Sequence, residues 1–349
     1  MNLKRSFGLS TPARPLATHS LASGSGLNQL DNQQRTYYRR VFLRAANPRL
    51  VFNAYGVAGT IPLNEGRTIS WGVMDPLQAG ETLAEAGDGT AATLTLDTVE
   101  ATLSDIGKYH QFSGHVETNA PDPVLRTLAE RLGIRAARDL DAATRDVLAA
   151  STNAYYTSAT AGDANITAAD IFNAEALADA VAAMEAADVP YITQFLAPNG
   201  GAGTVPGDPA YVMFCHAHVV SDIRANADAL GFEVVSKYAA GNAILPGEVG
   251  KIGNVRIVSA GSAGSFEADA GSGNVDVYHS ILVGAESYGV VDLGGRPVQF
   301  YAVPASTVNQ GNPLGRRGTI GYVGSHAAAI LDENGVAVIH SSSSYGANT

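Results

Sequence analysis

The feature that most constrains the fold is a single long amphipathic helix, predicted over residues 122–151. Asp122 is a favourable N-cap and Pro123 occupies the first helical position. Apolar residues then recur at steps of three or four and form one stripe: Leu125, Leu128, Leu132, Ala136, Leu140, Ala143 and Val147. Such a helix is about 43 Å long at about 1.5 Å per residue. Together with the long hairpin that precedes it in the chain, this helix predicts an extended shape rather than a compact enzyme.

Two further features of this helix lead to expectations. Gly133 lies in its interior, where glycine is about 1 kcal/mol less favourable than alanine, so we expect a bend or a close contact there. Arg135 and Asp139, and likewise Asp141 and Arg145, are spaced i, i+4 and are expected to pair on the polar side of the helix.

A long excursion precedes the helix, from about residue 66 to residue 114. Ile69, Trp71 and Val73 alternate with polar or small residues, which indicates a half-buried strand. The same alternation continues at Leu94 and Leu96, but the next apolar residues are out of phase with it: Val99, Ala101 and Leu103. This shift predicts a β-bulge near residues 97–98.

The tip between these strands, residues 75–89, is long, acidic and rich in glycine and alanine, with no hydrophobic core of its own. Loops of this length inside compact domains are uncommon and usually have a function. A tip that cannot bury itself in its own chain can be buried on a partner. The alternative is a flexible surface hairpin.

Composition and charge exclude several classes of protein. The 349 residues are 46% hydrophobic and 16% charged, which is enough for a real core and argues against general disorder. A net charge of -11 argues against a dedicated nucleic-acid binder. The single cysteine, Cys215, excludes an internal disulfide framework and a cysteine-only metal site. No apolar run has transmembrane length and no signal peptide is recognisable, so we expect a soluble protein that stays where it is made.

The charge is unevenly distributed along the chain. Residues 1–50 hold eight basic side chains and one acid, a net charge of +7, and the remaining 299 residues carry -18. Residues 1–27 are rich in Ser, Gly, Thr and Pro and predict an extended arm, with Lys4, Arg5 and Arg14 as its basic side chains. Such an arm contacts either a polyanion or the acidic surface of another subunit. An ordinary solvated tail is the third reading.

The other elements predict an α/β lobe followed by C-terminal strands. Helices are expected at about residues 30–46, ended by Asn47-Pro48, and at about residues 167–187. The later elements, in chain order, are a strand at 211–215, a helix at 218–229, strands at 255–258, 275–283 and 318–323, an Ala-rich piece at 327–330, a turn at 332–335 and a strand at 336–339.

Local motifs for catalysis are absent from the sequence. The glycine-rich runs at 199–203 and 261–273 lack the Lys-Ser/Thr ending of a P-loop, and no G-x-S-x-G elbow is present. Cys215-His216-Ala217-His218 is the one local cluster with metal-ligand potential, although a third ligand for His216 and His218 would have to come from elsewhere. Buried histidines at a strand end are more common. We therefore expect no catalytic, cofactor-binding or metal-binding residues and no cofactor.

Five stretches of sequence, in a fixed order, carry a resemblance to a known family. They are Tyr37-Tyr38-Arg39-Arg40-Val41-Phe42-Leu43, then Gly66-Arg67-Thr68-Ile69-Ser70-Trp71, then Ala136-Ala137-Arg138-Asp139-Leu140-Asp141 with Arg145-Asp146-Val147-Leu148, then Gly253-Asn254-Val255-Arg256-Ile257-Val258, and Arg317-Gly318-Thr319-Ile320-Gly321-Tyr322. With the order of the elements, they resemble the major capsid proteins of tailed bacteriophages, which have the Hong Kong 97 fold. Within that group the chain looks most similar to the family typified by the capsid protein of coliphage N-four. The resemblance spans roughly residues 30–340.

This resemblance implies an α+β fold with named parts: an N-terminal arm (1–30), the first helix of a peripheral domain (31–59), an extended β-hairpin loop (60–115), the peripheral domain with its long spine helix (116–187), an axial α/β domain (188–300) and a C-terminal return to the peripheral domain (301–349). It also implies roles for individual residues. These are an intersubunit loop tip (Gly80, Glu81, Glu85 and Asp88), a spine-helix core (Leu125, Leu128, Leu132, Leu140 and Val147) and a basic arm (Lys4, Arg5 and Arg14).

The implied function is that of a virion structural protein and not an enzyme. It would be a major capsid protein that self-assembles, as hexamers and pentamers, into the icosahedral shell around the double-stranded DNA of a tailed phage. Assembly would take place in the host cytoplasm with separate scaffolding and portal proteins, and with a decoration protein as a further candidate partner. Contact with packaged DNA would be non-specific, and no membrane is involved. Two alternatives stay open: an encapsulin-like shell, and a metal-dependent hydrolase that uses His216 and His218.

Overall fold

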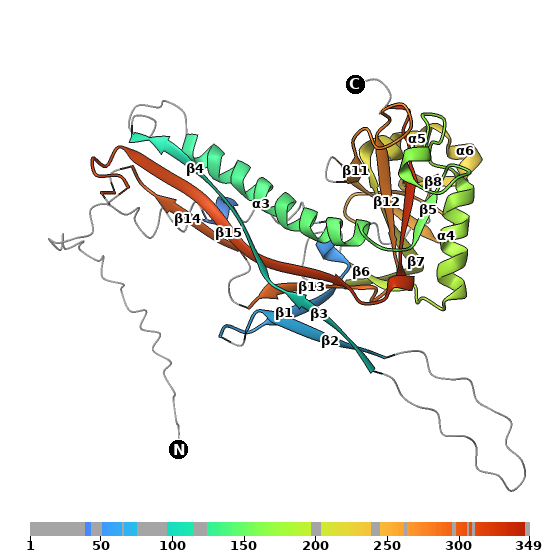
Figure 1. Cartoon of the computed structure of the whole chain (residues 1–349), viewed down its shortest axis with the longest axis horizontal. Helices are drawn as coiled ribbons and strands as arrows, with labels where there is room; N and C mark the ends of the chain where they lie inside the picture. The colour runs from blue at the N-terminus through green and yellow to red at the C-terminus, as the bar shows by residue number, and fades with distance from the viewer. Residues whose placement is uncertain are drawn as a thin grey trace, which may run out of the picture.

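The computed structural model describes residues 39–42, 51–64, 66–74, 96–114, 124–196, 204–238, 245–261, 264–294, 298–305, 307–308 and 311–345. Within these residues the chain forms an elongated part, made of a sheet and one long helix, and a lobe at one end of it (Figure 1). No helix in the described part of the chain is long and apolar enough to cross a membrane.

The elongated part is a five-stranded sheet built around one long strand. The sheet has the order β1 (Val57–Ile61), β13 (Tyr288–Leu293), β15 (Arg317–Ile330) and β14 (Val298–Val303), and β4 (Ser104–Ser113) pairs antiparallel with β15. The strand predicted at 318–323 and the Ala-rich piece at 327–330 are thus one continuous strand, β15.

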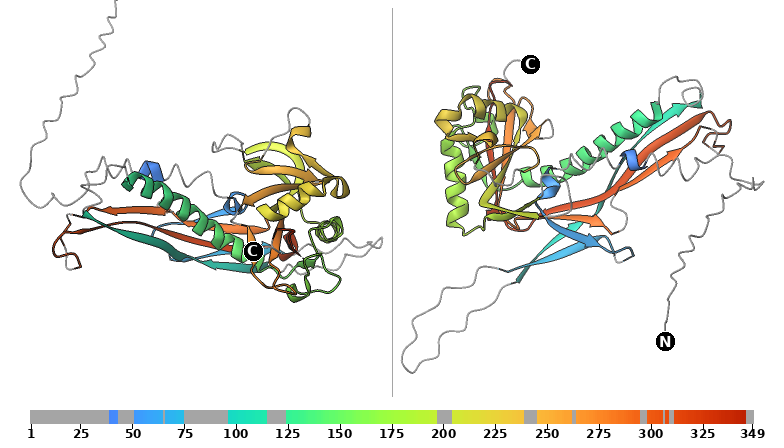
Figure 2. Two further views of the ribbon diagram at one scale, coloured as in Figure 1. Left: turned by 90° about the horizontal axis from the view of Figure 1, so that it is seen from above. Right: turned by 180° about the vertical axis from the view of Figure 1, so that it is seen from behind.

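The helix α3 (Val124–Ala149) lies along one face of this sheet, as the two views of Figure 2 show. Because side chains alternate along a strand, every second residue of β15 points at the helix. Ile320 and Tyr322 are each 2% exposed there and pack in one cluster with Leu132. Phe42, from the short described helical stretch 39–42, belongs to the same cluster and lies against Gly133, so the close contact expected at this glycine is confirmed. The rest of the helix predicted at 30–46 lies outside the described residues.

Strands β2 (Thr68–Met74) and β3 (Leu96–Thr102) form a separate antiparallel ribbon that projects from the elongated part (Figure 1). Its register is continuous from end to end, so the β-bulge predicted near residues 97–98 is wrong. The change of phase in the sequence has a simpler cause. Leu96 faces solvent and is 59% exposed, whereas Ala101 belongs to the buried face of the ribbon.

The base of the ribbon is anchored to the sheet by Trp71. A Cβ on Gly289 of β13 would lie 2.6 Å from the indole ring, so the absence of a side chain at this position lets the indole pack closely on the strand. Ile69 and Trp71 pack with Ile61 and Val291 in a small core between ribbon and sheet. The base of the ribbon is therefore packed on the sheet, and the rest of the ribbon projects away from it.

The lobe contains a nine-stranded mixed sheet. Its main path runs β5 (Ala154–Tyr156), β16 (Val336–Ser341), β12 (Val277–Val283), β7 (Thr204–His216), β10 (Val255–Gly261), β9 (Glu248–Ile252) and β8 (Phe232–Val234). Two further strands, β6 (Ile192–Leu196) and β11 (Ser265–Glu267), pair with β7 and β12. The strands predicted at 211–215, 255–258 and 336–339 fall within β7, β10 and β16, and the one predicted at 275–283 begins two residues later as β12.

The helices of the lobe differ from their predicted bounds for local reasons. The helix predicted from residue 167 begins at residue 174 as α4 (Ala174–Ala186), because the side chain of Asn173 accepts the backbone N–H of Ala176 and caps the helix there. The helix predicted at 218–229 is divided into α5 (Ala217–Ala225) and α6 (Ala227–Leu230) at Asn226. Helices α4 and α5 pack on one face of the sheet with Phe172, and the other face buries Phe214 and Leu148.

Candidate functional site

The buried face of α3 holds polar as well as apolar side chains. Of the five residues proposed as its core, Leu132 and Leu140 are buried, and Leu125, Leu128 and Val147 are half-buried. The face that the structure buries also contains Ala129, Ala136, Ala137, Asp141, Thr144 and Leu148. The helix is therefore rotated slightly relative to the apolar stripe read from the sequence.

Asp141 corrects one of the two predicted ion pairs. Its carboxylate is fully buried and accepts the backbone N–H groups of Val51, Phe52 and Asn53, at 2.8 Å for Phe52. Burial raises the pKa of this carboxyl group, although these hydrogen bonds act in the opposite direction. Arg145 pairs instead with its neighbour Asp146, at 2.6 Å. Three backbone N–H groups at the start of a short helical turn satisfy the Asp141 carboxylate better than one surface cation would.

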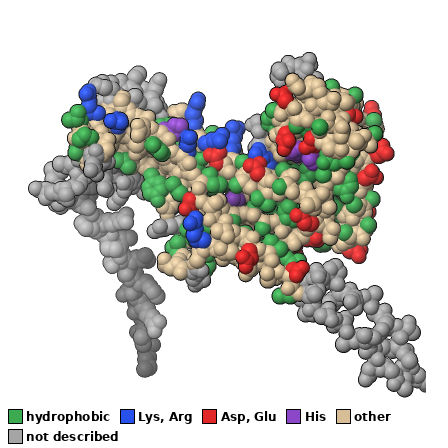
Figure 3. Space-filling view, in the orientation of Figure 1, with side chains coloured by type: hydrophobic (Ala, Val, Ile, Leu, Met, Phe, Trp, Pro, Cys, Tyr) green, Lys and Arg blue, Asp and Glu red, His purple; other side chains and the backbone are tan. Residues whose placement is uncertain are grey.

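The solvent side of α3 is a row of arginines. Arg126, Arg131, Arg135 and Arg138 are all exposed, and Figure 3 shows Lys and Arg side chains gathered along this helix. The second predicted ion pair is confirmed, with Arg135 2.7 Å from Asp139. This row is the main basic surface in the view of Figure 3.

The lobe carries charge of the opposite sign. The sequence has no Lys or Arg between Arg145 and Arg224. The outer face of α4 and its end expose four acids instead: Glu175, Asp179, Glu185 and Asp188. Among the charged side chains of the lobe in Figure 3, most are acidic. One molecule thus presents a basic surface and an acidic surface that cannot meet within the same chain, because they lie on different parts of it.

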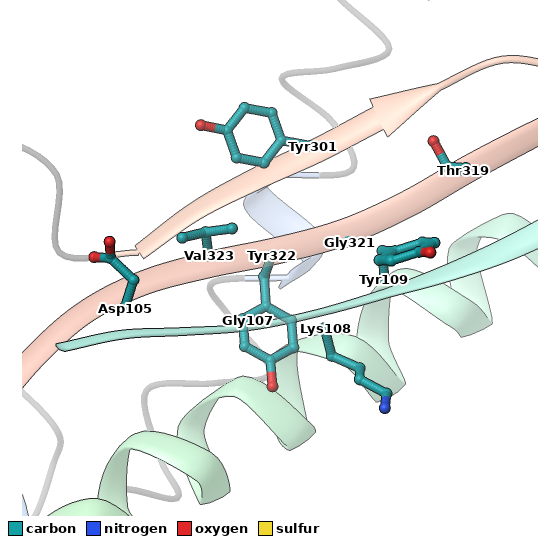
Figure 4. Close-up of a pocket in the computed structure, with 9 residues that line it drawn as sticks. All are labelled: Asp105, Gly107, Lys108, Tyr109, Tyr301, Thr319, Gly321, Tyr322 and Val323. Atoms are coloured by element: carbon teal, nitrogen blue, oxygen red, sulfur yellow. The ribbon is translucent and has the colours of Figure 1, made fainter. Parts of the chain in front are cut away.

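The sheet face turned away from α3 is hollowed into an open groove of about 340 Å³ between β4, β15 and β14 (Figure 4). Tyr109, Tyr301 and Val323 line it and are 66%, 52% and 42% exposed. A Cβ on Gly321 would lie 2.8 Å from the Cβ of Tyr109, so the glycine makes room for this ring to lie across β15. Large exposed aromatic side chains in a hollow are typical of a contact surface. We call this surface the tyrosine groove.

The motif Cys215-His216-Ala217-His218 has a structural role. The Nδ1 atom of His216 accepts the backbone N–H of His218 at 3.2 Å and caps α5, and Nδ1 of His218 lies 2.8 Å from the hydroxyl of Tyr278. Burial raises the pKa of the Cys215 thiol to about 12 and lowers that of His216 to about 4. In the described part of the chain, no cluster of possible metal ligands includes these residues.

The cluster of possible metal ligands that the structure does form was missed by the sequence analysis. It consists of Asp163, His279 and His340, whose ligand atoms lie within 4.8 Å of one another. No local spacing could have revealed it, because the three residues are distant in the sequence. Other predicted site residues lie outside the described residues, namely Lys4, Arg5, Arg14, Gly80, Glu81, Glu85 and Asp88.

Comparison with known proteins gives one family and several solved structures. A family model described as "Phage capsid protein" matches residues 72–339, which is about three quarters of the chain. No curated protein sequence matches the chain.

Three solved structures share the fold over nearly the whole chain. The capsid of Ralstonia phage GP4 has a TM-score of 0.64 at 16% identity, and the alignment covers 97% of this chain and 98% of that one. The capsid of cyanophage P-SCSP1u has a TM-score of 0.57 at 12% identity and covers 93% of each chain. The capsid asymmetric unit of cyanophage Pam1 has a TM-score of 0.52 at 16% identity, with 95% and 100% covered.

Proposed function

The chain belongs to the phage capsid protein family, and we propose that copies of it close an icosahedral shell around the double-stranded DNA genome of a tailed phage. The observation that carries this proposal is the family match over residues 72–339. The similarity in fold to three phage capsid structures supports it. The chain is a structural protein of the virion and not an enzyme, so the hydrolase reading of His216 and His218 is abandoned.

The finer division of the chain follows from the same proposal. The sheet around β15 with α3 would be the peripheral domain and its spine helix, and residues 188–300 would supply most of the axial domain at the centre of a hexamer or pentamer. Residues 1–30 would be the N-terminal arm and residues 60–115 the extended loop. The fold would then be the Hong Kong 97 fold, in a chain most similar to the capsid protein of coliphage N-four.

The β2–β3 ribbon supports the extended-loop part of the proposal. Its base is packed through Trp71, and its two strands lead away from both cores toward residues 75–95. A ribbon that is held at its base and gains no burial from its own lobe can be stabilised by a neighbouring copy. The tip residues Gly80, Glu81, Glu85 and Asp88 would then make intersubunit contacts.

The tyrosine groove and the two charged surfaces suggest where a second copy docks. Tyr109 and Tyr301 offer apolar area that the chain itself leaves exposed. The arginine row on α3 complements the acidic face of α4, so that adjacent copies can attract each other despite a net charge of -11. Each contact can be weak, because a closed shell repeats it many times.

The proposal includes other partners, although no feature of the described residues identifies them. Separate scaffolding and portal proteins would guide assembly in the host cytoplasm, with a decoration protein as a further candidate. DNA contact would be non-specific. An encapsulin-like shell is the less favoured alternative, because the matching family is one of phage capsids.

The test is assembly of the purified full-length chain, alone and together with the scaffolding protein of its phage. Size-exclusion chromatography and negative-stain electron microscopy should show capsomers or closed shells of megadalton mass. A protein that stays a 36.0 kDa monomer with and without the scaffold, at every salt concentration, would contradict the proposal. Shells that enclose enzymes, and that never contain DNA in infected cells, would favour the encapsulin-like alternative.

A further inference from the structure

Two histidines from neighbouring strands of the lobe face each other. His279 of β12 is paired directly with His340 of β16 in the antiparallel ladder, and their ring centroids are 4.5 Å apart. Asp163, in the short turn Asp163–Asn165, brings its carboxylate to the same place. Three potential ligands from three separate segments therefore converge beside the sheet.

The distances between these groups do not form a complete hydrogen-bond network. Nδ1 of His340 lies 2.6 Å from one carboxylate oxygen of Asp163, which is a good hydrogen bond. Nε2 of His279 lies 4.0 Å from the other oxygen, too far for one. This nitrogen is buried, on a side chain that is 6% exposed, and has no hydrogen-bond partner among the residues that the structure describes. An ion pair between His340 and Asp163 alone leaves the Nε2 atom unexplained.

The orientation of His279 is fixed from its other side. Its Nδ1 atom lies 3.0 Å from the hydroxyl of Ser265, in the neighbouring strand β11. This contact holds the ring so that Nε2 points at Asp163 and His340. A metal-binding histidine usually has its second ring nitrogen held by a polar group that fixes the ring, and Ser265 is such a group for Nδ1 of His279.

We propose that Asp163, His279 and His340 bind one divalent transition-metal ion, with Zn²⁺ as the ion that best fits the site. Two imidazole nitrogens and one carboxylate are a frequent Zn²⁺ ligand set, with a water molecule as the fourth ligand. Bond lengths of about 2.0–2.2 Å place tetrahedral ligands roughly 3.3 Å apart. The 2.6 Å and 4.0 Å separations, each to a different oxygen of Asp163, lie on either side of this value, and the ligand atoms of the three residues all lie within 4.8 Å of one another.

Metal binding would join parts of the lobe that are distant in the sequence. Asp163 lies in the segment between β5 and α4, and this segment also contacts the last strand through the hydrogen bond from Thr157 to the carbonyl of His340. An ion held by Asp163, His279 and His340 would fix that segment to the two central strands β12 and β16. We therefore expect the ion to stabilise the folded subunit, independently of whether subunits assemble.

The first experiment measures binding with Zn²⁺ itself. Full-length protein is stripped with EDTA and titrated with ZnCl₂ by calorimetry, and bound metal is counted by mass spectrometry after gel filtration. The expected result is one Zn²⁺ per chain, lost in Asp163→Asn and in His340→Asn. Ser265→Ala should keep the stoichiometry and weaken the affinity by roughly 10-fold to 100-fold, because it removes only the group that orients His279.

Two variants serve as matched controls. His218→Asn removes a histidine of the Cys215–His218 motif, and His110→Asn removes an exposed histidine of β4. Both should bind one Zn²⁺ as the unaltered chain does. Zinc that is absent from the unaltered protein, or retained in Asp163→Asn and His340→Asn, would overturn the proposal, and zinc lost in His218→Asn alone would assign the metal to the other motif.

The second experiment separates a metal ligand from a residue that only supports the fold. Co²⁺ bound in place of Zn²⁺ should give visible d–d absorption bands that disappear in Asp163→Asn. Zn²⁺, but not Mg²⁺, should raise the melting temperature of the stripped unaltered protein by several degrees and leave that of Asp163→Asn unchanged. Equal shifts in the two proteins, or a lower melting temperature in Asp163→Asn without any metal effect in the unaltered chain, would reduce the cluster to an ordinary ion pair.

Discussion

The backbone carbonyl of Phe42 occupies the space that a side chain on Gly133 would need. This contact places the helical stretch 39–42 directly on α3. It also positions the ring of Phe42 against Phe300 and Tyr322 of the sheet, at centroid distances of 5.3 Å and 6.2 Å. The presence of glycine at position 133 is therefore explained by the close approach of Phe42 and not by a bend in the helix.

Gly133→Ala should destabilise the subunit, although alanine favours helix by about 1 kcal/mol. The new Cβ forces Phe42 away from its cluster, and such overpacking typically costs about 1–3 kcal/mol in the free energy of unfolding. Urea denaturation measures the change. Gly72→Ala in β2 is the control, because its Cβ would have its nearest neighbour at 3.6 Å. A stabilised Gly133→Ala variant would contradict the packing described for residues 39–42.

Asp141 should make the free energy of unfolding depend on pH. Burial raises its pKa in the folded chain, so the folded state keeps the proton where the unfolded state, with a pKa of about 3.9, has lost it. The stability that this group contributes therefore falls as the pH rises from the unfolded pKa through the folded pKa. Asp141→Asn has no such proton. The excess stability of the unaltered chain over Asp141→Asn should be largest at the acidic end and shrink toward neutral pH.

The control for this experiment is Asp141→Ala. It leaves the buried N–H group of Phe52 without an acceptor, which costs about 1–3 kcal/mol, and also removes the part-buried hydrogen bonds of Val51 and Asn53. This variant should be strongly destabilised at every pH. Denaturant titrations at a series of pH values compare the three proteins, and a difference between unaltered chain and Asp141→Asn that grows with pH would show that the sign is wrong.

The tyrosine groove should matter for assembly more than for folding. Changing Tyr109 and Tyr301 together to Ser removes exposed aromatic area, so the isolated subunit should lose less than about 1 kcal/mol of stability. The yield of capsomers and shells, measured by sedimentation and electron microscopy, should fall. Leu314→Ser is the matched control, because Leu314 is 78% exposed but lies outside the groove. Unchanged yields for the double variant would remove the groove from the contact surface.

Deletion of residues 80–89 tests the role proposed for the extended loop. The deletion leaves both cores intact, so we expect a folded, soluble subunit or capsomer that no longer closes shells. Replacing the same ten residues with a Gly/Ser linker of equal length distinguishes the chemistry of the tip from its reach. Electron microscopy scores closure and circular dichroism scores folding, and normal particles from both variants would show that the tip makes no essential contact.

Substitutions in the basic arm test which surface its positive charges contact. If Lys4, Arg5 and Arg14 lie on the acidic surface of a neighbour, changing all three to Ala should lower the yield or stability of DNA-free shells, most clearly at low salt. The exposed acids of α4 are the surface that this reading favours. Lys4→Arg, Arg5→Lys and Arg14→Lys together retain the charge and should assemble normally. Empty shells that match unaltered ones at all salt concentrations, combined with poor genome retention, would assign the arm to DNA.

The elements predicted best are those whose signals are local. The apolar spacing of α3 lies within its own sequence, and the buried strands β7, β10 and β16 read as short continuous apolar runs. The incorrect predictions concern features that no local signal in the sequence reveals. Nothing near Leu96 indicates that this leucine faces solvent, and nothing near Asp141 indicates that its partners are N–H groups about 90 residues away.

The candidate sites were harder to predict than the fold because they are formed by pairing between distant segments. His340 and Asp163 are 177 residues apart, and only the β12–β16 register brings His279 opposite His340. The tyrosine groove likewise requires β4 and β14 to flank β15. The Cys215–His218 motif was conspicuous because its residues are adjacent, yet its side chains are used to cap a helix and to pack on Tyr278.

The connection between β15 and β16 has a consequence for the synthesis of the protein. The two strands are consecutive, separated by one short turn, yet β15 lies inside the five-stranded sheet and β16 lies between β5 and β12 in the nine-stranded one. Domains usually fold in order as the chain leaves the ribosome. Here neither sheet is complete until residues 317–341 have left the ribosome. A chain without these residues completes neither sheet and leaves strand edges unpaired. Because one segment supplies an inner strand to each sheet, the two sheets complete their folding together.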